Sequence, residues 1–196
     1  MPDLKVPTPV FDRRSFLKTS VCSALAVPIL SKLAVAAPAA ETSSALNALP
    51  ERSLSFYNLH TSESLSTVYW QSGEYLASSL SEINRVLRDH RTGEEHEIDS
   101  KLLDLLCVLR LRLETTKPLQ IISGYRSPAT NAMLNAKSEG VATRSLHMDG
   151  QAIDIRVPGR DLSLVRKAAL AMKSGGVGYY PTSNFVHVDV GRVRNW

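Results

Sequence analysis

The chain has 196 residues, which is room for one domain, or for one domain behind a processed leader. Its net charge of +4 would favour nucleic-acid binding if the charge were spread over the fold, but residues 1–40 hold five Lys and Arg against two Asp. The rest of the chain is therefore close to neutral, which removes the electrostatic argument for a nucleic-acid partner.

Residues 1–40 have the features of an export signal. Paired arginines in "FDRRSFLK" resemble the twin-arginine signal of exported bacterial proteins, and the apolar run that follows is interrupted by Pro28 and Lys32 and is too short to span a bilayer comfortably. Alanines near position 40 suit cleavage of the A-x-A type. We therefore expect recognition by the twin-arginine (Tat) export machinery, a periplasmic location and no membrane span after cleavage. An uncleaved amphipathic anchor is the alternative.

A polar tether at 41–52 is expected to lead into one domain at 53–196. The spacing of apolar residues predicts, in chain order, a β-hairpin at 53–70, helices at 74–90 and 93–116, a short strand at 118–127, a helix at 128–139, a strand at 152–157, a helix at 162–174, a turn or short strand at 175–181 and a last strand at 184–190. This order favours an α+β fold, with helices packed on a small, mainly antiparallel sheet.

Local signals mark the ends of these helices. Asp99 suits the N-cap of the second helix, Ser127 and Pro128 suit the N-cap and first position of the third, and Gly140 would end it. Cys107 lies in a leucine-rich helix and is predicted to be a core thiol. The other cysteine lies in the leader, so no internal disulfide is possible after cleavage.

Two of the expected strands turn polar residues to one side. In "AIDIRV" the β-branched residues share one face and Asp154 lies on the other, and in "FVHVDV" the valines share one face while His187 and Asp189 lie opposite. If the two strands are neighbours, Asp154 and His187 meet. His147 could then reach them from a loop that Gly150 allows to turn tightly.

Two imidazoles and one carboxylate with an open fourth position form the ligand set of a catalytic zinc ion, whose bound water has a pKa of about 7 and attacks carbonyls as hydroxide. The spacing leaves an ordinary alternative equally open. In that alternative His147 caps a turn, Asp154 pairs with Arg156 or Arg126, and His187 is a partly exposed strand residue.

Two longer motifs resemble a known family. "SGYRSPATNAMLNAKSEGVATRSLHMDGQAIDIRV" and "GGVGYYPTSNFVHVDVG" resemble the YcbK-like (MepK-type) murein endopeptidases, in the zinc peptidase group of the D-alanyl-D-alanine carboxypeptidases and VanX. The resemblance extends from about residue 58 to Trp196, and its most specific parts are S-x-H-x-x-G-x-A-x-D and F-V-H-V-D. It implies a hedgehog/D,D-peptidase-like fold and a Zn²⁺ ion bound by His147, Asp154 and His187.

The resemblance also implies roles around the zinc ion. Arg126 matches the family's arginine, which approaches the scissile carbonyl or a substrate carboxylate and would stabilise the developing oxyanion. The alternative for Arg126 is a structural ion pair with Asp149 or Asp154. Ser145 is expected to orient His147 or Asp154.

The general base departs from the pattern of the wider group. Carboxypeptidase- and VanX-like relatives place an acid three positions before the second zinc histidine, where this chain has Asn184, which cannot accept a proton from zinc-bound water. Asp189 is the candidate for the base, or for a group that supports the ligand. An ion pair of Asp189 with Arg192 or Arg194 is the alternative.

The predicted function is hydrolysis of the peptide cross-links between peptidoglycan stem peptides by an exported, monomeric zinc peptidase. Tyr179 and Tyr180 would line its peptide groove or pack in the core. A D,D-carboxypeptidase acting on the stem peptide is the nearest alternative. Because Asn184 replaces the expected acid, a non-catalytic wall-binding module on the same fold is a further one. The sequence leaves open whether a 3–3 or a 4–3 cross-link is cut.

Overall fold

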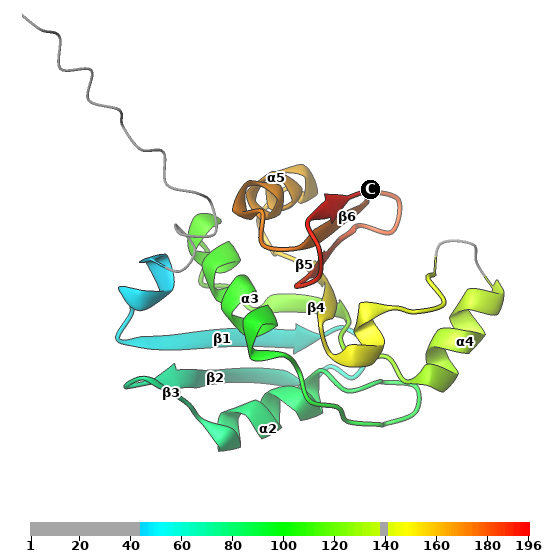
Figure 1. The fold of residues 1–196 in the computed structure, drawn as a ribbon, viewed down its shortest axis with the longest axis horizontal. Helices are drawn as coiled ribbons and strands as arrows, with labels where there is room; N and C mark the ends of the chain where they lie inside the picture. Colours follow the sequence, from blue (N-terminus) through cyan, green and yellow to red (C-terminus); the bar gives the residue numbers. More distant parts are fainter. Residues whose placement is uncertain (1–43, 138–140) are drawn as a thin grey trace, which may run out of the picture. The chain divides into compact units, whose positions relative to one another are not determined.

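In the computed structural model, residues 44–137 and 141–196 are described, and they form an α+β fold around one mixed sheet (Figure 1). The predicted leader at 1–40 and the glycine predicted to end the third helix lie outside these residues. Within the described ranges, no helix combines the length and the apolar character that crossing a membrane requires.

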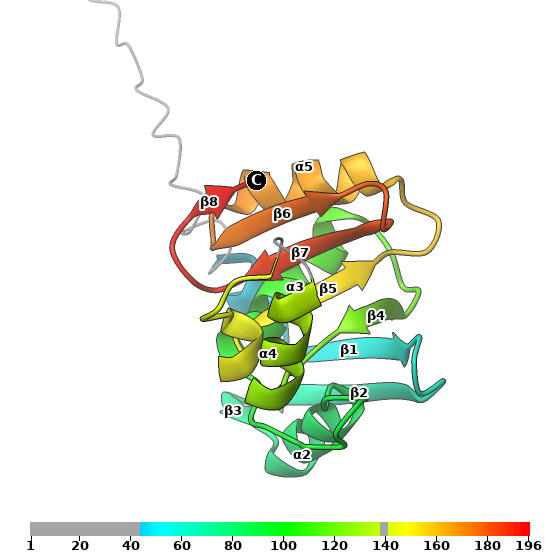
Figure 2. The ribbon, with the colours of Figure 1, turned by 90° about the vertical axis from the view of Figure 1, so that its right-hand side faces the viewer.

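The sheet has eight strands in the order β3-β2-β1-β4-β5-β7-β6-β8 (Figure 2). Its strands are β1 (Glu51–Asn58), β2 (Ser64–Gln71), β3 (Glu74–Tyr75), β4 (Leu119–Ser123), β5 (Ala152–Arg156), β6 (Gly176–Tyr180), β7 (Phe185–Asp189) and β8 (Arg194–Asn195). The pairings of β1 with β4 and of β6 with β8 are parallel, and the remaining pairings are antiparallel. The predicted α+β class is confirmed, but the sheet is mixed because two connections return to a neighbouring strand in the same direction.

The helices form layers on the sheet. They are α2 (Ala77–Val86), α3 (Ser100–Arg112), α4 (Pro128–Lys137) and α5 (Leu162–Met172), with a short 3-10 helix, η1 (Leu146–Asp149). Figures 1 and 2 show α3 and α5 on one face of the sheet and α4 on the other. The functional site lies on the α4 side.

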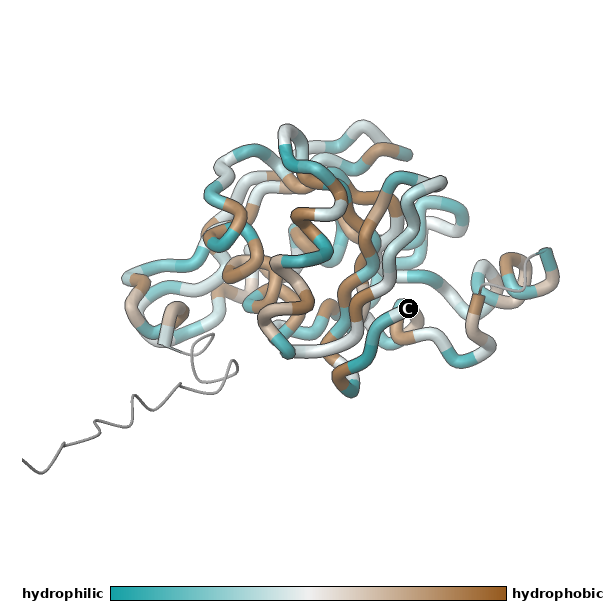
Figure 3. The backbone as a smooth tube through the Cα atoms, turned by 90° about the horizontal axis from the view of Figure 1, so that it is seen from above, coloured by the Kyte–Doolittle hydropathy of each residue, from teal (hydrophilic) through white to brown (hydrophobic). Residues whose placement is uncertain are grey.

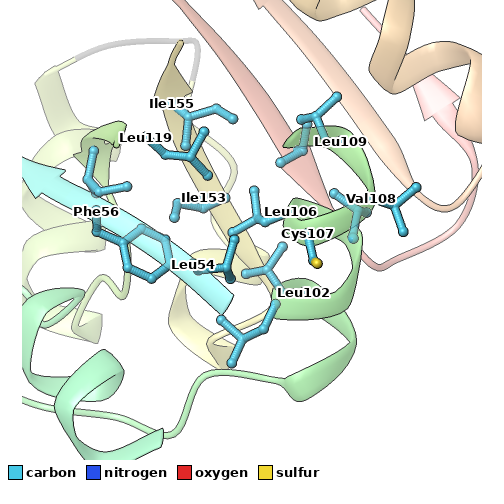
Figure 4. Close-up of a cluster of buried hydrophobic side chains, with 14 of the residues drawn as sticks. Leu54, Phe56, Leu102, Leu106, Cys107, Val108, Leu109, Leu119, Ile153 and Ile155 are labelled. Atoms are coloured by element: carbon cyan, nitrogen blue, oxygen red, sulfur yellow. The ribbon is translucent and has the colours of Figure 1, made fainter. Parts of the chain in front are cut away.

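The core fills the space between α3 and the sheet (Figure 4). Inward residues of β1, such as Leu54 and Phe56, contact the helix layer, and both are fully buried. On α3, Leu106 and Cys107 are at most 1% exposed, so the predicted core thiol is confirmed. Figure 3 shows hydrophobic residues gathering in the interior, as expected where burial of each large apolar side chain contributes about 1.5–3 kcal/mol.

The predicted caps of two helices are observed, whereas the second helix, predicted from residue 93, begins only at Ser100. The Asp99 side chain accepts a hydrogen bond from the Lys101 amide at 2.9 Å and caps α3, and the Ser127 hydroxyl accepts one from the Thr130 amide at 3.2 Å. The helix predicted from residue 74 begins at 77 because 74 and 75 pair with β2. Leu46, in the expected tether, is only 7% exposed, and β1 begins at 51. The boundary of the tether stays a prediction.

Gly150 ends η1 in the left-handed region, at φ +65°, and a Cβ there would fall on the carbonyl oxygen of Glu97. We expect Gly150→Ala to lower the free energy of unfolding by more than the about 1–2 kcal/mol that the left-handed conformation costs an L-residue. Gly93→Ala is the matched control, because Gly93 has φ +76° but open space around it. Denaturant unfolding of both variants measures how much more Gly150→Ala lowers the free energy of unfolding because of the clash with Glu97. If both variants lose the same free energy, the clash does not contribute.

Candidate metal centre

The register of β5 and β7 places Asp154 directly opposite His187. The residues on either side of them in each strand, Ile153, Ile155, Val186 and Val188, are buried toward α3 and α5. Because side chains alternate along a strand, Asp154 and His187 project from the opposite face, where the two strands present them to each other. The two-residue alternation in the sequence predicts this meeting correctly.

The 3-10 helix η1 brings His147 to the same place. The Ser145 side chain accepts a hydrogen bond from the His147 amide at 3.4 Å and so caps η1. The backbone carbonyl of His147 accepts a hydrogen bond from the Arg126 amide at 3.1 Å. The Nδ1 atom of the His147 ring lies 2.8 Å from the carbonyl oxygen of Gly124. Since a carbonyl can only accept, Nδ1 bears the proton and Nε2 presents a lone pair to the site.

The ring of His187 is also fixed by a hydrogen bond, but here Nε2 makes the bond and Nδ1 faces the site. Its Nε2 lies 3.0 Å from Oδ2 of Asp189, which is fully buried. Burial alone would raise the pKa of Asp189, but hydrogen bonds from His187, Arg194 and two backbone amides hold it well below its usual range. The ionised carboxylate accepts from Nε2–H, and His187 Nδ1 is therefore the atom that faces the site.

Three electron-pair donors converge at the centre of the site. His147 Nε2 lies 3.2 Å from His187 Nδ1 and 3.4 Å from Oδ1 of Asp154, and His187 Nδ1 lies 2.9 Å from that same oxygen. A tetrahedral ion with ligand bonds of about 2.0–2.1 Å holds its ligand atoms roughly 3.3 Å apart. All three residues are buried, and their donor atoms are close enough together to occupy one face of the coordination sphere of a tetrahedral metal ion.

The electrostatics of the site also favour a cation. Burial would raise the pKa of Asp154. When a proton rather than a metal ion lies between the donor atoms, the charge of His147 and the hydrogen bonds from His147 and His187 hold this pKa well below its usual range, so the carboxylate stays ionised. Burial would lower the pKa of His187, but hydrogen bonds and charges from Asp154 and Asp189 raise it instead. Without a proton or a metal ion, the converging lone pairs would repel one another.

Arg126 lies at the edge of this group without a strong partner. Its Nη2 is 3.8 Å from Oδ2 of Asp154 and 3.4 Å from the Ser123 hydroxyl, and its Nη1 is 3.5 Å from Oδ1 of Asn131. Its Nε is buried and has no hydrogen-bond partner, although the side chain is only 11% exposed. A guanidinium held this loosely among acceptors retains donors for an oxygen of a bound molecule.

A cavity of about 390 Å³ is lined by His147, Asp154 and His187 among other residues. Tyr180, Phe185 and Trp196 form an aromatic part of its lining: the Tyr180 and Phe185 rings stack at 4.5 Å, and the Trp196 indole donates to the Tyr180 hydroxyl at 2.7 Å. Tyr179 does not line the cavity; it packs against the core and lies under the guanidinium of Arg166. Because side chains alternate along β6, Tyr180 lines the cavity and Tyr179 packs against the core.

Asn184, at the position where an acid is expected by resemblance to the carboxypeptidase- and VanX-like group, lies in a tight turn. Asn184 ends the β6–β7 connection at φ +55°, and its amide donates to the carbonyl of Pro181 at 3.1 Å. Asparagine tolerates this left-handed conformation better than most residues. Asn184 does not line the cavity, whereas Asp154 is the carboxylate residue among the described lining residues.

Sequence reasoning missed the backbone groups that support the site. The Gly124 carbonyl orients His147, while the amides of Gly176 and Gly191 and the guanidinium of Arg194 hold Asp189 at 2.7–3.0 Å. Backbone groups leave no signal in a sequence pattern. The ion pair of Asp189 with Arg194, one of the alternatives that the sequence leaves open, is present in the structure at 2.7 Å.

Comparison with known proteins identifies relatives over the same region. The family described as peptidoglycan L,D-endopeptidase MepK matches residues 46–196. A protein of Escherichia coli (strain K12) named peptidoglycan L,D-endopeptidase MepK is 48% identical over 145 residues, which cover 74% of this chain and 80% of the relative. A Haemophilus influenzae protein named probable peptidoglycan L,D-endopeptidase MepK is 40% identical over 146 residues, covering 74% and 78%. The family match includes every residue of the site.

Proposed function

The chain belongs to the peptidoglycan L,D-endopeptidase MepK family, and from this membership we propose that it cleaves L,D peptide bonds in peptidoglycan cross-links with a zinc ion at His147, Asp154 and His187. The observation that supports the metal is the convergence of three buried donor atoms within 2.9–3.4 Å of one another. The ligand set of two imidazoles and one carboxylate, beside an open cavity, is typical of catalytic zinc.

A zinc ion held there would supply a Lewis acid and an activated water. The chain's own residues position the substrate around it. Arg126, whose Nη1 and Nη2 make only long contacts of 3.4–3.8 Å, would bind the carbonyl oxygen as negative charge develops on it, and a preorganised donor of this kind contributes about 10²–10³-fold to the rate. The aromatic lining that includes Tyr180 and Trp196 would hold the peptide and exclude water.

Asp189 has two possible roles, and its surroundings support the positioning one. It is fully buried, does not line the cavity, and its oxygens already accept from His187, Arg194 and two amides. A carboxylate so placed can fix the ring of His187 and the tautomer that presents Nδ1, but it has no open path to a water in the cavity.

We further infer that residues 1–40 are a twin-arginine signal and that the domain acts as a monomer in the periplasm. The support is the paired arginines of the leader and the location of peptidoglycan outside the cytoplasmic membrane. The segment after the leader then joins the domain that begins near β1.

Product analysis of purified cross-linked muropeptides tests the proposed activity. We expect each cut to add one water and to release two monomers, one with a new amine and one with a new carboxyl group, and a chelator to stop the reaction until zinc is restored. Loss of a single D-alanine would instead indicate a D,D-carboxypeptidase. Retention on sacculi without any new amine would indicate a non-catalytic wall-binding module.

A further inference from the structure

A third arginine in the cavity has no role in the site described so far. Arg144 is exposed and lines the cavity together with Arg126 and Arg194. Arg194 is bound to both oxygens of Asp189, and Arg126 lies 3.8 Å from Asp154. Among the described residues, no acidic side chain pairs with Arg144, so its planar set of donors is available to a ligand.

The segment that presents Arg144 is held in place by a buried residue of α4. Asn131 is 3% exposed, and its Nδ2 donates to the carbonyls of Ala142 and Thr143, both at 3.1 Å. Its Oδ1 accepts from Nη1 of Arg126 at 3.5 Å. One amide side chain therefore links the guanidinium of Arg126 to the backbone that immediately precedes Arg144.

The charge of the cavity favours an anionic ligand. Its described charged lining consists of three arginines and Asp154, and a divalent ion at the ligand residues would make the balance more positive still. A guanidinium binds a carboxylate through two parallel hydrogen bonds, so the interaction depends on the geometry of the carboxylate as well as on its charge. A carboxylate near the reacting bond is thus the group that this lining recognises best.

We propose that Arg144 is a specificity residue that binds the free carboxylate on the amine side of the scissile bond. The inference rests on the proposed function: in an L,D bond between two amino-acid centres, the α-carbon that follows the scissile nitrogen also bears a carboxyl group. With Arg126 on the carbonyl oxygen, Arg144 is the remaining unpaired cation of the lining for that carboxylate. The enzyme then distinguishes cross-links with a free carboxylate from those in which it is amidated.

Kinetics on a matched pair of muropeptides test this assignment. With the free carboxylate, Arg144→Gln is expected to lower kcat/KM by about 10- to 100-fold, mainly through KM, because one charge-assisted bidentate contact is lost. With the amidated substrate, wild type and variant are expected to be equal. Arg144→Lys should keep part of the preference for the free carboxylate, since lysine keeps the positive charge but cannot form two parallel hydrogen bonds. Arg192→Gln, an exposed arginine outside the cavity lining, is the matched control.

Binding separates the failure of this inference from failure of the proposed function. Calorimetric titration of both peptides into chelator-treated wild type and Arg144→Gln protein measures the carboxylate preference without turnover. A preference in the wild type that the variant lacks supports the role of Arg144, even if no cleavage is found. Equal binding of the two peptides by the wild type, or an equal loss for both in the variant, overturns it.

Discussion

We expect His147→Ala and His187→Ala proteins to lose zinc binding and muropeptide cleavage while remaining folded. Each residue supplies one of three donor atoms, and with only two left the ion has no closed set of protein ligands. The loss of activity should exceed the about 10- to 100-fold that removal of a supporting group costs. Metal content of the purified proteins and product formation from muropeptides are the two measurements.

A matched control is needed because His147 also supports the fold. Its Nδ1 donates to the Gly124 carbonyl, and the alanine variant leaves that oxygen without its partner. His60 offers the same kind of contact outside the site, since its Nε2 lies 3.0 Å from the carbonyl of Ile122. His60→Ala should keep full activity, and it should destabilise the fold less than His147→Ala because its hydrogen bond is exposed whereas that of His147 is buried. Cleavage by a metal-free His147→Ala, His187→Ala double variant would exclude the proposed mechanism.

The part of the site that depends on strand alternation is predictable from sequence. Side chains on a strand repeat every two residues, so the apolar faces of β5 and β7 place Asp154 and His187 together once the strands pair. The same rule, applied to β6, separates Tyr179 from Tyr180. His147 is different, because its position depends on a loop and on η1, and only the resemblance to the endopeptidase family, now confirmed, identifies it.

Features set by the path of the backbone could not be predicted in this way. The parallel pairing of β1 with β4 depends on where a connection with two helices returns, and that of β6 with β8 follows a connection through β7. β8 has only two residues, too few for a periodic signal. The last strand was predicted at β7, but β8 follows it. Of the four groups that surround Asp189, two are backbone amides, and one of these, the amide of Gly176, comes from the neighbouring strand β6.

The surroundings of Asp189 lead to the second prediction. Asp189→Asn keeps the size of the side chain but removes the charge that Arg194 and the ring of His187 bond to. If Asp189 positions the ligand, zinc affinity should fall by about 10- to 100-fold, because the His187 tautomer and ring orientation are no longer fixed. At saturating zinc, kcat should then return close to the wild-type value.

A general base would give the opposite pattern. Asp189→Asn would then bind zinc normally and keep a low kcat at every zinc concentration, because the missing proton acceptor cannot be restored by metal. Asp149→Asn is the matched control, since Asp149 is an exposed carboxylate on η1, near the ligands in sequence but outside the cavity lining. Arg194→Ala gives an independent check, because it removes a partner of Asp189 and leaves the carboxylate in place. Weaker zinc binding in this variant is expected only if the Asp189–Arg194 ion pair acts by holding His187 in position.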